Sequence, residues 1–218
     1  MDKKIGIIGA MELEVADLKE SMDIDKVTKR AGRDFFEGTL EGISVVVVQC
    51  GIGKVNAGIC VQVLADMFGV THVVNTGVAG ALNPELNIGD ILVSKKALQH
   101  DMDVSPLGYK PGQVPGLEVL EFEADKDMAD CIYSVCMEVN PDIKVKKGVV
   151  VSGDQFISSA EIKERLVNDF HGDCAEMEGA AIAQAAYLNG LPFVVVRALS
   201  DKADGAATVD YPTFEKEA

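Results

Sequence analysis

The sequence predicts an α/β protein, a three-layer αβα sandwich in which helices cover both faces of a central, twisted sheet of mixed but mainly parallel strands. Short runs of β-branched residues recur along the chain, and segments with apolar residues at helical spacing lie between several of these runs. The composition, with 48% hydrophobic residues, 25% charged residues and 21 glycines, is that of an ordinary globular α/β protein.

The expected strands are short and apolar, as strands buried on both faces are. They are, in order, Ile5–Ile8, Val45–Val48, Val73–Val74, Ile91–Val93, Val149–Val151 and Val194–Val196. The expected helices are Leu13–Met22, Val55–Phe68, Met128–Val139, Ile162–Phe170 and Met177–Leu188. Because this alternation builds a parallel sheet, whose ligands bind beyond the carboxyl ends of the strands, the search for chemistry starts there.

The length of 218 residues suits one substantial core, so we expect a single domain over residues 1–218. Residues 211–218 resemble the first turn of a helix that stops almost as it starts, which suggests that part of a C-terminal helix is missing. The stretch His100–Gly116 contains three prolines and three glycines without clear periodicity. We expect it to be a loop excursion of the kind that covers a binding site.

The formal net charge of −15 argues against a nucleic-acid partner, because such binding relies on clustered lysine and arginine to neutralise phosphates. The five cysteines form no C-x-x-C pair, so neither a disulfide framework nor a zinc knuckle is indicated, and a reducing compartment fits. No apolar run approaches the ~20 residues that a membrane helix needs. We therefore expect a cytoplasmic protein with no nucleic-acid or membrane partner.

Glycine-containing segments follow the first three expected strands, at residues 9–14, 51–54 and 77–80. Glycine lets the backbone approach a ligand closely. The segments complete no cofactor motif, since Asn56 stands where G-x-G-x-x-G needs its last glycine and Val55 follows Lys54 where a Walker loop needs Ser or Thr. We expect no cofactor. We also expect no metal, because the three histidines show no ligand spacing.

Acidic residues gather at the same positions. Glu12 and Glu14 stand at one expected helix start and Glu176 and Glu178 at another, where the helix dipole stabilises an acid whatever its function. Asp201 differs, because it stands just after the apolar run 193–199, with only Ser200 between them. Its carboxylate is expected to emerge from a buried strand at the point where a ligand would lie.

Several ordered motifs together resemble the 5′-methylthioadenosine/S-adenosylhomocysteine nucleosidases, within the nucleoside phosphorylase family. The resemblance runs nearly end to end. The motifs are GIIGAMELEV (6–15), GIGKVN (51–56), NTG (75–77), HDMDV (100–104), VSGDQFI (151–157), AEME (175–178) and VRALSD (196–201). The resemblance implies a nucleoside phosphorylase-like fold and water-dependent cleavage of the bond between ribose and adenine.

The resemblance also implies a role for each matching residue. Glu14 would be the base on the attacking water, Glu178 would bind the ribose hydroxyls, and Asp201 would pass a proton to purine N7. Phe156 would stack on adenine and the backbone beside Ile157 would read its edge. The remaining substrate contacts would come from Met11, Ile52, Met177, Val78, Val104, Leu107 and Tyr211, with Glu176 and Arg197 supporting the ribose site. Tyr109 and Pro115 would reach the neighbouring subunit's pocket, which implies a homodimer.

The chemistry independently calls for these residue types. Loss of a purine from ribose passes through an oxocarbenium-like state, so an enzyme must stabilise a cationic sugar and protonate the leaving base. Two carboxyl groups in different environments serve this need. Glu14 near a helix start suits the base, and Asp201, less solvated at a strand end, suits the proton donor.

Three positions depart from the family pattern. Val78 stands where a small hydroxyl residue is usual, Leu107 replaces an aromatic residue, and Tyr211 occupies a position that is commonly Phe. Val78 and Leu107 bear on the ribose and the 5′ substituent, whereas Tyr211 would keep the stacking on adenine and add a hydroxyl. None of the three changes alters the expected reaction class.

Several alternatives remain open. They are a phosphate-dependent phosphorylase, hydrolysis of another adenine nucleoside such as aminofutalosine or 5′-deoxyadenosine, and a non-catalytic nucleoside-binding module. A phosphorylase would need a cationic anion pocket, which the residues around Asn75 and Val78 do not supply. A nicotinamide dehydrogenase is the weakest alternative because its glycine fingerprint is missing.

Overall fold

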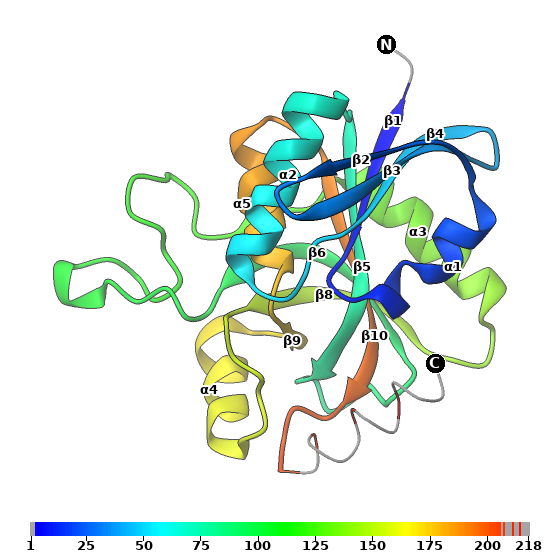
Figure 1. Ribbon diagram of the computed structural model, residues 1–218. Coiled ribbons are helices and arrows are strands. Elements are labelled where there is room, and N and C mark those ends of the chain that lie inside the picture. Colours follow the sequence, from blue (N-terminus) through cyan, green and yellow to red (C-terminus); the bar gives the residue numbers. More distant parts are fainter. Residues whose placement is uncertain (1–2, 206, 208–210, 212–213, 215–218) are drawn as a thin grey trace.

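A computed structural model describes residues 3–205, 207, 211 and 214 (Figure 1). The strands are β1 (Lys4–Gly9), β2 (Asp23–Arg30), β3 (Arg33–Leu40), β4 (Ile43–Gln49), β5 (His72–Ala81), β6 (Ile91–Gln99), β7 (Phe122–Glu123), β8 (Val145–Ser152), β9 (Cys174–Glu176) and β10 (Phe193–Asp201). The α-helices are α1 (Ala16–Ser21), α2 (Lys54–Phe68), α3 (Lys126–Val139), α4 (Ala160–Phe170) and α5 (Gly179–Leu188). Two 3₁₀ turns, η1 (Glu12–Glu14) and η2 (Ser105–Leu107), complete the set.

The strands form one mixed sheet in the order β10-β6-β8-β9-β5-β1-β4-β3-β2. Parallel pairs join β1 to β4 and β5, and β5 to β10. Antiparallel pairs join β10 to β6, β5 to β9 and β3 to its two neighbours. Because β10 also pairs with β5, the strands β5, β10, β6, β8 and β9 are linked in a ring of pairings.

Helices lie on both sides of this sheet. Figure 1 shows α2 and α5 on one side and α1 and α3 on the other. Helix α2 buries Ala57, Cys60, Val61, Leu64 and Phe68, whose spacing puts them on one face. It packs against α5, whose small residues admit a close neighbour. The mixed α/β fold with a central sheet is therefore confirmed.

The structure corrects the sequence-based elements in several places. An antiparallel hairpin of β2 and β3 occupies residues 23–40, where no strand was predicted. Strand β5 is much longer than residues 73–74 and runs through the glycine segment 77–80, which was expected to follow the strand. Glu176 belongs to strand β9 rather than to a helix start. Part of the expected C-terminal helical turn, residues 212–213 and 215–218, lies outside the described residues.

Strand ends converge at one edge of the sheet. Asp201 at the end of β10 pairs with Gly80 of β5, beyond an irregularity in register after Leu199. Gly80 also pairs with Ala175 of β9, so β5 lies between the ends of β9 and β10. The end of β1 lies on the same side of β5 as β9, since Asn75 pairs with Ile8 of β1 on this side and with Val195 of β10 on the other. In the described part of the chain, no helix is long and apolar enough to cross a membrane.

Candidate active site

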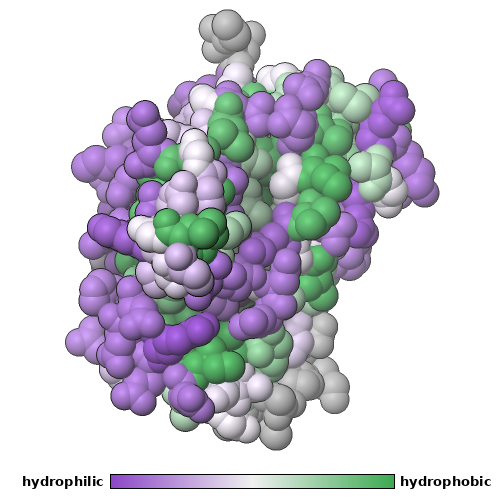
Figure 2. All heavy atoms as spheres, turned by 90° about the vertical axis from the view of Figure 1, so that its left-hand side faces the viewer, coloured by the Kyte–Doolittle hydropathy of each residue, from purple (hydrophilic) through white to green (hydrophobic). Residues whose placement is uncertain are grey.

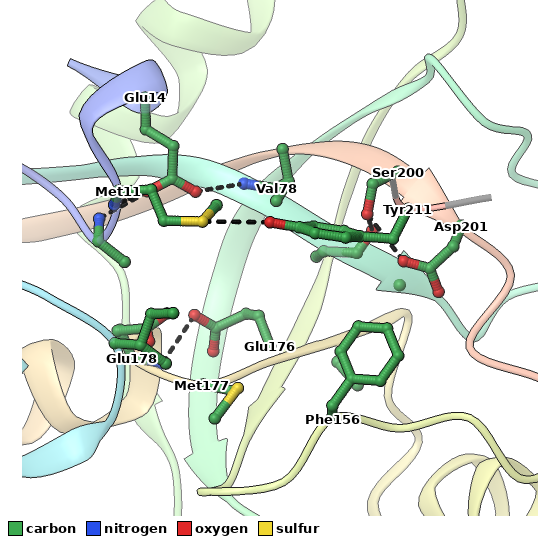
Figure 3. A pocket seen from close by; sticks show the side chains of 15 residues that line it. Met11, Glu14, Val78, Phe156, Glu176, Met177, Glu178, Ser200, Asp201 and Tyr211 are labelled. Carbon is green, nitrogen blue, oxygen red and sulfur yellow. Dashed lines mark hydrogen bonds between the residues drawn. The ribbon is translucent and has the colours of Figure 1, made fainter. Parts of the chain in front are cut away.

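A cavity of about 330 Å³ lies at these strand ends, a volume typical of sites for small ligands. Its wall combines apolar side chains with carboxylates, and Figure 3 shows Glu14, Glu178 and Asp201 on different sides of it. The predicted site residues that line the cavity are Met11, Glu14, Ile52, Val78, Phe156, Glu176, Met177, Glu178, Asp201 and Tyr211. Ile157 lines a smaller space that shares Phe156 and Asp201 with the cavity.

Three backbone N–H groups hold the Glu14 carboxylate. Ala10 and Met11 donate to its Oε2 at 2.6 and 2.9 Å, because η1 folds the side chain back onto the turn after β1. Val78 of β5 donates to Oε1 at 3.1 Å. Hydrogen bonds to an ionised acceptor are strong, so these contacts fix the carboxylate against two strands.

The Asp201 carboxylate is fixed by its own neighbours. The Ser200 hydroxyl donates to Oδ2 at 2.8 Å and the Ala203 N–H donates to Oδ1 at 2.8 Å. Asp201 is only 2% exposed, yet it lines the cavity. A buried carboxylate held at the edge of a cavity is suited to proton transfer to a ligand there.

Two glycines of β5 make room for these carboxylates. A Cβ on Gly77 would lie 2.5 Å from Glu14 Oε1, and one on Gly80 would lie 2.8 Å from Asp201 Oδ1. Any side chain at either position would therefore displace a carboxylate. This explains why strand β5 carries glycines, which made the segment resemble a loop in the sequence.

Glu178 stands at the N-cap position of α5. The Gly53 N–H, at the start of α2, donates to its Oε1 at 2.7 Å. Burial raises the pKa of Glu178 to about 7, and the charges of Glu176 and Glu14 add to this rise, while the Gly53 N–H and Arg197 oppose it. The carboxyl group of Glu178 therefore titrates near neutral pH.

Glu176 and Arg197 form a buried ion pair beneath the cavity. Arg197 is 2% exposed, and its Nη2 donates to Glu176 Oε2 and to Asn75 Oδ1, both at 2.5 Å. Glu176 also accepts from the Ser152 hydroxyl and from the Gly179 N–H. Burial opposes ionisation of Glu176, but Arg197 and these hydrogen bonds keep its pKa below the usual range. Arg197 thus supports Glu176 and does not line the cavity itself.

Aromatic and thioether side chains line the cavity between the carboxylates. The Phe156 and Tyr211 rings meet edge to face, with centroids 5.9 Å apart. The Tyr211 hydroxyl donates to Met11 Sδ at 3.1 Å (Figure 3). Flat apolar surfaces of this kind suit a planar, aromatic ligand.

The residues predicted on the loop excursion lie elsewhere. Val104, Leu107, Tyr109 and Pro115 do not line the cavity of their own chain. Leu107 is 75% exposed, and the segment projects from the body on the left of Figure 1. Sequence reasoning in turn missed Ser200, which lines the cavity and bonds to Asp201, although its place beside Asp201 was a usable signal.

The cavity wall carries no positive side chain among the described residues. The described residues also contain no group of three or more His, Cys, Asp or Glu placed to hold a metal ion. The carboxyl groups of this wall can move protons and stabilise a developing cation; they belong to Glu14, Glu176, Glu178 and Asp201.

Comparisons with known proteins agree with the motifs. The chain matches the phosphorylase superfamily over residues 4–218. A 5′-methylthioadenosine/S-adenosylhomocysteine nucleosidase of an Exiguobacterium species is 42% identical over 97% of this chain and 90% of its own length.

Two solved structures extend this similarity to the fold. The Colwellia psychrerythraea nucleosidase of the same name, in complex with adenine, is 40% identical with a TM-score of 0.95, over 100% of this chain and 90% of that one. A futalosine hydrolase of Helicobacter pylori is 34% identical with a TM-score of 0.92, over 99% and 91%. This chain therefore belongs to the 5′-methylthioadenosine/S-adenosylhomocysteine nucleosidase family of the phosphorylase superfamily.

Proposed function

We propose that this protein is an N-glycosyl hydrolase that cleaves 5′-methylthioadenosine and S-adenosylhomocysteine, releasing adenine and the thioribose product. The observation that carries the proposal is the placement of Glu14, Glu178 and Asp201 around one cavity. The nucleosidase relatives, and the adenine in the Colwellia psychrerythraea structure, support the choice of substrate.

The three carboxylates divide the reaction between them. Glu14 accepts a proton from water, and the oxygen of the resulting hydroxide forms a bond to the anomeric carbon. Asp201 donates a proton to purine N7, so that the electron pair of the breaking glycosidic bond stays on a neutral base. Glu178 accepts hydrogen bonds from the ribose hydroxyls, which become better donors as the ring gains positive charge.

The apolar wall supplies recognition. Phe156 and Tyr211 enclose the adenine ring, and the backbone beside Ile157 reads its edge. Met11, Ile52, Met177 and Val78 contact the ribose and the thioether, for which polarisable sulfur and aliphatic surfaces are suitable partners.

Water rather than phosphate is the proposed nucleophile. A phosphorylase must hold a multiply charged anion, which takes arginine, lysine or several free N–H donors. Within the described residues, the cavity has no Lys or Arg in its wall, and the N–H groups of Ala10, Met11 and Val78 are already bonded to Glu14. Phosphate, which carries one or two negative charges near neutral pH, would be repelled by the carboxylates of the cavity wall.

We further propose that the active form is a homodimer in which the segment 100–121 completes the partner's substrate site. Tyr109 and Pro115 would then reach the pocket of the partner subunit, and Val104 and Leu107 of the same segment would contact the 5′ substituent. Exposed apolar residues at the start of α2, namely Ile52, Val55 and Ile59, provide a surface for this contact. Figure 2, which faces the side bearing this segment, shows apolar patches among polar ones.

We also propose that residues 1–218 form one three-layer domain. The solved relatives support this, since the chain covers about nine-tenths of each at high TM-score.

An assay of adenine release in phosphate-free buffer tests the activity. We expect methylthioadenosine to be cleaved at an undiminished rate without phosphate. A panel that adds S-adenosylhomocysteine, 5′-deoxyadenosine and aminofutalosine ranks the 5′ substituents, because Val78 and Leu107 bear on that end of the substrate. A strict requirement for phosphate, or no cleavage of any member of the panel, would refute the proposal.

A further inference from the structure

A cluster of charged side chains lies behind the cavity wall without lining it. We call Lys54, Asp101 and Asp154 the Lys54 cluster. Lys54 Nζ donates to Asp101 Oδ1 at 2.6 Å and to Gln99 Oε1 at 2.9 Å. The Asp154 N–H donates to Asp101 Oδ2 at 3.0 Å. Lys54 and Asp101 are each 17% exposed, so this ion pair is partly shielded from solvent.

The cluster caps helix α2 from a distant part of the chain. Gly53, at the N-cap, has no side chain to cap the helix, and Asp154 Oδ1 instead accepts the Lys54 N–H at 2.8 Å. The preceding N–H, that of Gly53, points to Glu178 Oε1. Two successive amides of one turn are thus fixed, one by Asp154 and the other against Glu178.

The same cluster anchors two segments that carry predicted site residues. Asp154 belongs to the segment 153–157, which also carries Phe156 and Ile157, and Gly153 ties this segment to β9 by donating to the Glu176 carbonyl at 3.1 Å. Asp101 lies where the segment 100–121 leaves β6. The cluster therefore joins the start of α2, the aromatic wall and the base of the projecting loop.

We propose that the Lys54 cluster positions the Gly53 N–H against Glu178 and aligns the Phe156 segment with it, so that the ribose and adenine subsites are set by one hydrogen-bonded unit. Its members are positioning residues, because none of them lines the cavity. The proposal rests on the function proposed above and names residues that this function does not use.

The charges around Glu178 make the proposal testable by pH. Its carboxyl group is surrounded by the Gly53 N–H and by four titratable groups. These are Glu176 on β9, Arg197 on β10, Glu14 on η1 and the thiol of Cys50 after β4. Loss of the Gly53 hydrogen bond would raise the pKa of Glu178. Removal of the negative charge of Asp154 would by itself lower this pKa, so the two effects have opposite signs.

The experiment compares Asp154→Ala with Asp125→Ala. Asp125 caps α3 in the same manner, by accepting the Met128 N–H at 2.9 Å, but belongs to neither the cavity nor the Lys54 cluster. The pH profile of kcat/KM for methylthioadenosine is measured for both variants, with thermal unfolding to compare their stability. We expect the acidic limb of Asp154→Ala to move up by about one pH unit, a tenfold loss on that limb. The limb of Asp125→Ala should not move.

Two further variants guard the conclusion. Asp154→Asn keeps an oxygen that can accept the Lys54 N–H but loses the negative charge, so its acidic limb should lie at or slightly below that of the wild type. If Asp154→Ala does not fold, Asp101→Asn takes its place, with the same upward shift expected. An acidic limb of Asp154→Ala that stays still or moves down, an upward shift in Asp154→Asn, or an equal shift in Asp125→Ala would overturn the proposal.

A titration of ¹³C-labelled glutamate carboxyls by NMR, assigned with Glu178→Gln, reads the Glu178 proton without any turnover. This measurement distinguishes failure of the proposed function from failure of the proposed role of the Lys54 cluster. A wild-type protein that releases no adenine would refute the proposed function. An active wild type, with the pKa of Glu178 unchanged in Asp154→Ala, would refute only the role of the Lys54 cluster.

Discussion

Two regions of the molecule are held in place in contrasting ways. One is the part of the cavity wall formed by Glu14, Glu176 and Asp201, which we call the strand-end half, and the other is the projecting segment 100–121. At the strand ends, Glu14 accepts three backbone N–H bonds and Glu176 pairs with a buried arginine. In the projecting segment, contacts such as the bond from the Gly112 N–H to the Met102 carbonyl are internal, and Leu107 is mostly exposed. This contrast indicates that the carboxylates are fixed within one chain, whereas the segment 100–121, which we propose contacts the 5′ substituent in a partner subunit, has few such anchors to the body of its own chain.

The largest effect is expected from the proton-transfer carboxylates. Glu14→Gln and Asp201→Asn should each lower kcat by about 10²- to 10⁴-fold, because each removes a general acid or base from the reaction. Binding of an adenine analogue, measured by calorimetry, should remain detectable in both, since the aromatic wall is untouched. Full activity in both variants would remove the strand-end half from the mechanism.

The buried ion pair should dominate stability. Arg197→Met leaves Glu176 as an uncompensated buried charge, which typically costs ~3–5 kcal/mol of unfolding free energy. Chemical denaturation measures this loss. Arg165→Met, at an exposed position on α4, is the control and should change stability by less than ~0.5 kcal/mol. Equal losses in the two variants would mean that the strand-end half is not held by this pair.

The acidic limb of the pH profile should report Glu178. Because burial raises its pKa to about 7, its ionised fraction falls about tenfold per unit at pH values well below 7. The protonated group accepts ribose hydroxyls less well, so kcat/KM should fall with the same slope. In Glu178→Gln the acidic limb should disappear, and kcat/KM should be lower than in the wild type at all pH values above this limb. A wild-type profile that is flat from pH 5 to 8 would contradict the assignment of the limb to Glu178.

The smallest effects are expected in the projecting segment. Leu107→Ala and Tyr109→Ala should leave the free energy of unfolding within ~0.5 kcal/mol of the wild type, as surface substitutions usually do. The KM for methylthioadenosine should rise several-fold, while adenine binding stays the same. Val135→Ala, at an exposed apolar position on α3, is the matched control. If KM is unchanged in both loop variants, the segment does not contact the 5′ substituent.

The same contrast separates what the sequence could predict from what it could not. Helix α2 begins and ends within one residue of its predicted bounds, because its apolar residues recur at helical spacing. The β2–β3 hairpin was missed, because β2 is largely exposed and its turn uses Ala31 and Gly32 instead of Asn-Gly. An exposed edge strand carries little apolar signal.

The candidate site was predictable in part. Most residues of the cavity wall could be predicted from the acidic residues and the motifs that contain them. This is because side chains at the ends of parallel strands share one edge of the sheet. The pairing of Glu176 with Arg197, and the capping of Lys54 by Asp154, depend on contacts between residues far apart in the chain. The glycines of β5 indicate a loop in the sequence, although in the structure they make room for carboxylates within a strand.

The identity of the sugar product decides whether water or phosphate attacks the substrate beside Glu14, Glu178 and Asp201. The protein is incubated with methylthioadenosine in buffer that contains phosphate, and the products are identified by mass spectrometry. We expect adenine and free methylthioribose in equal amounts. Methylthioribose 1-phosphate as the sugar product would contradict attack by water.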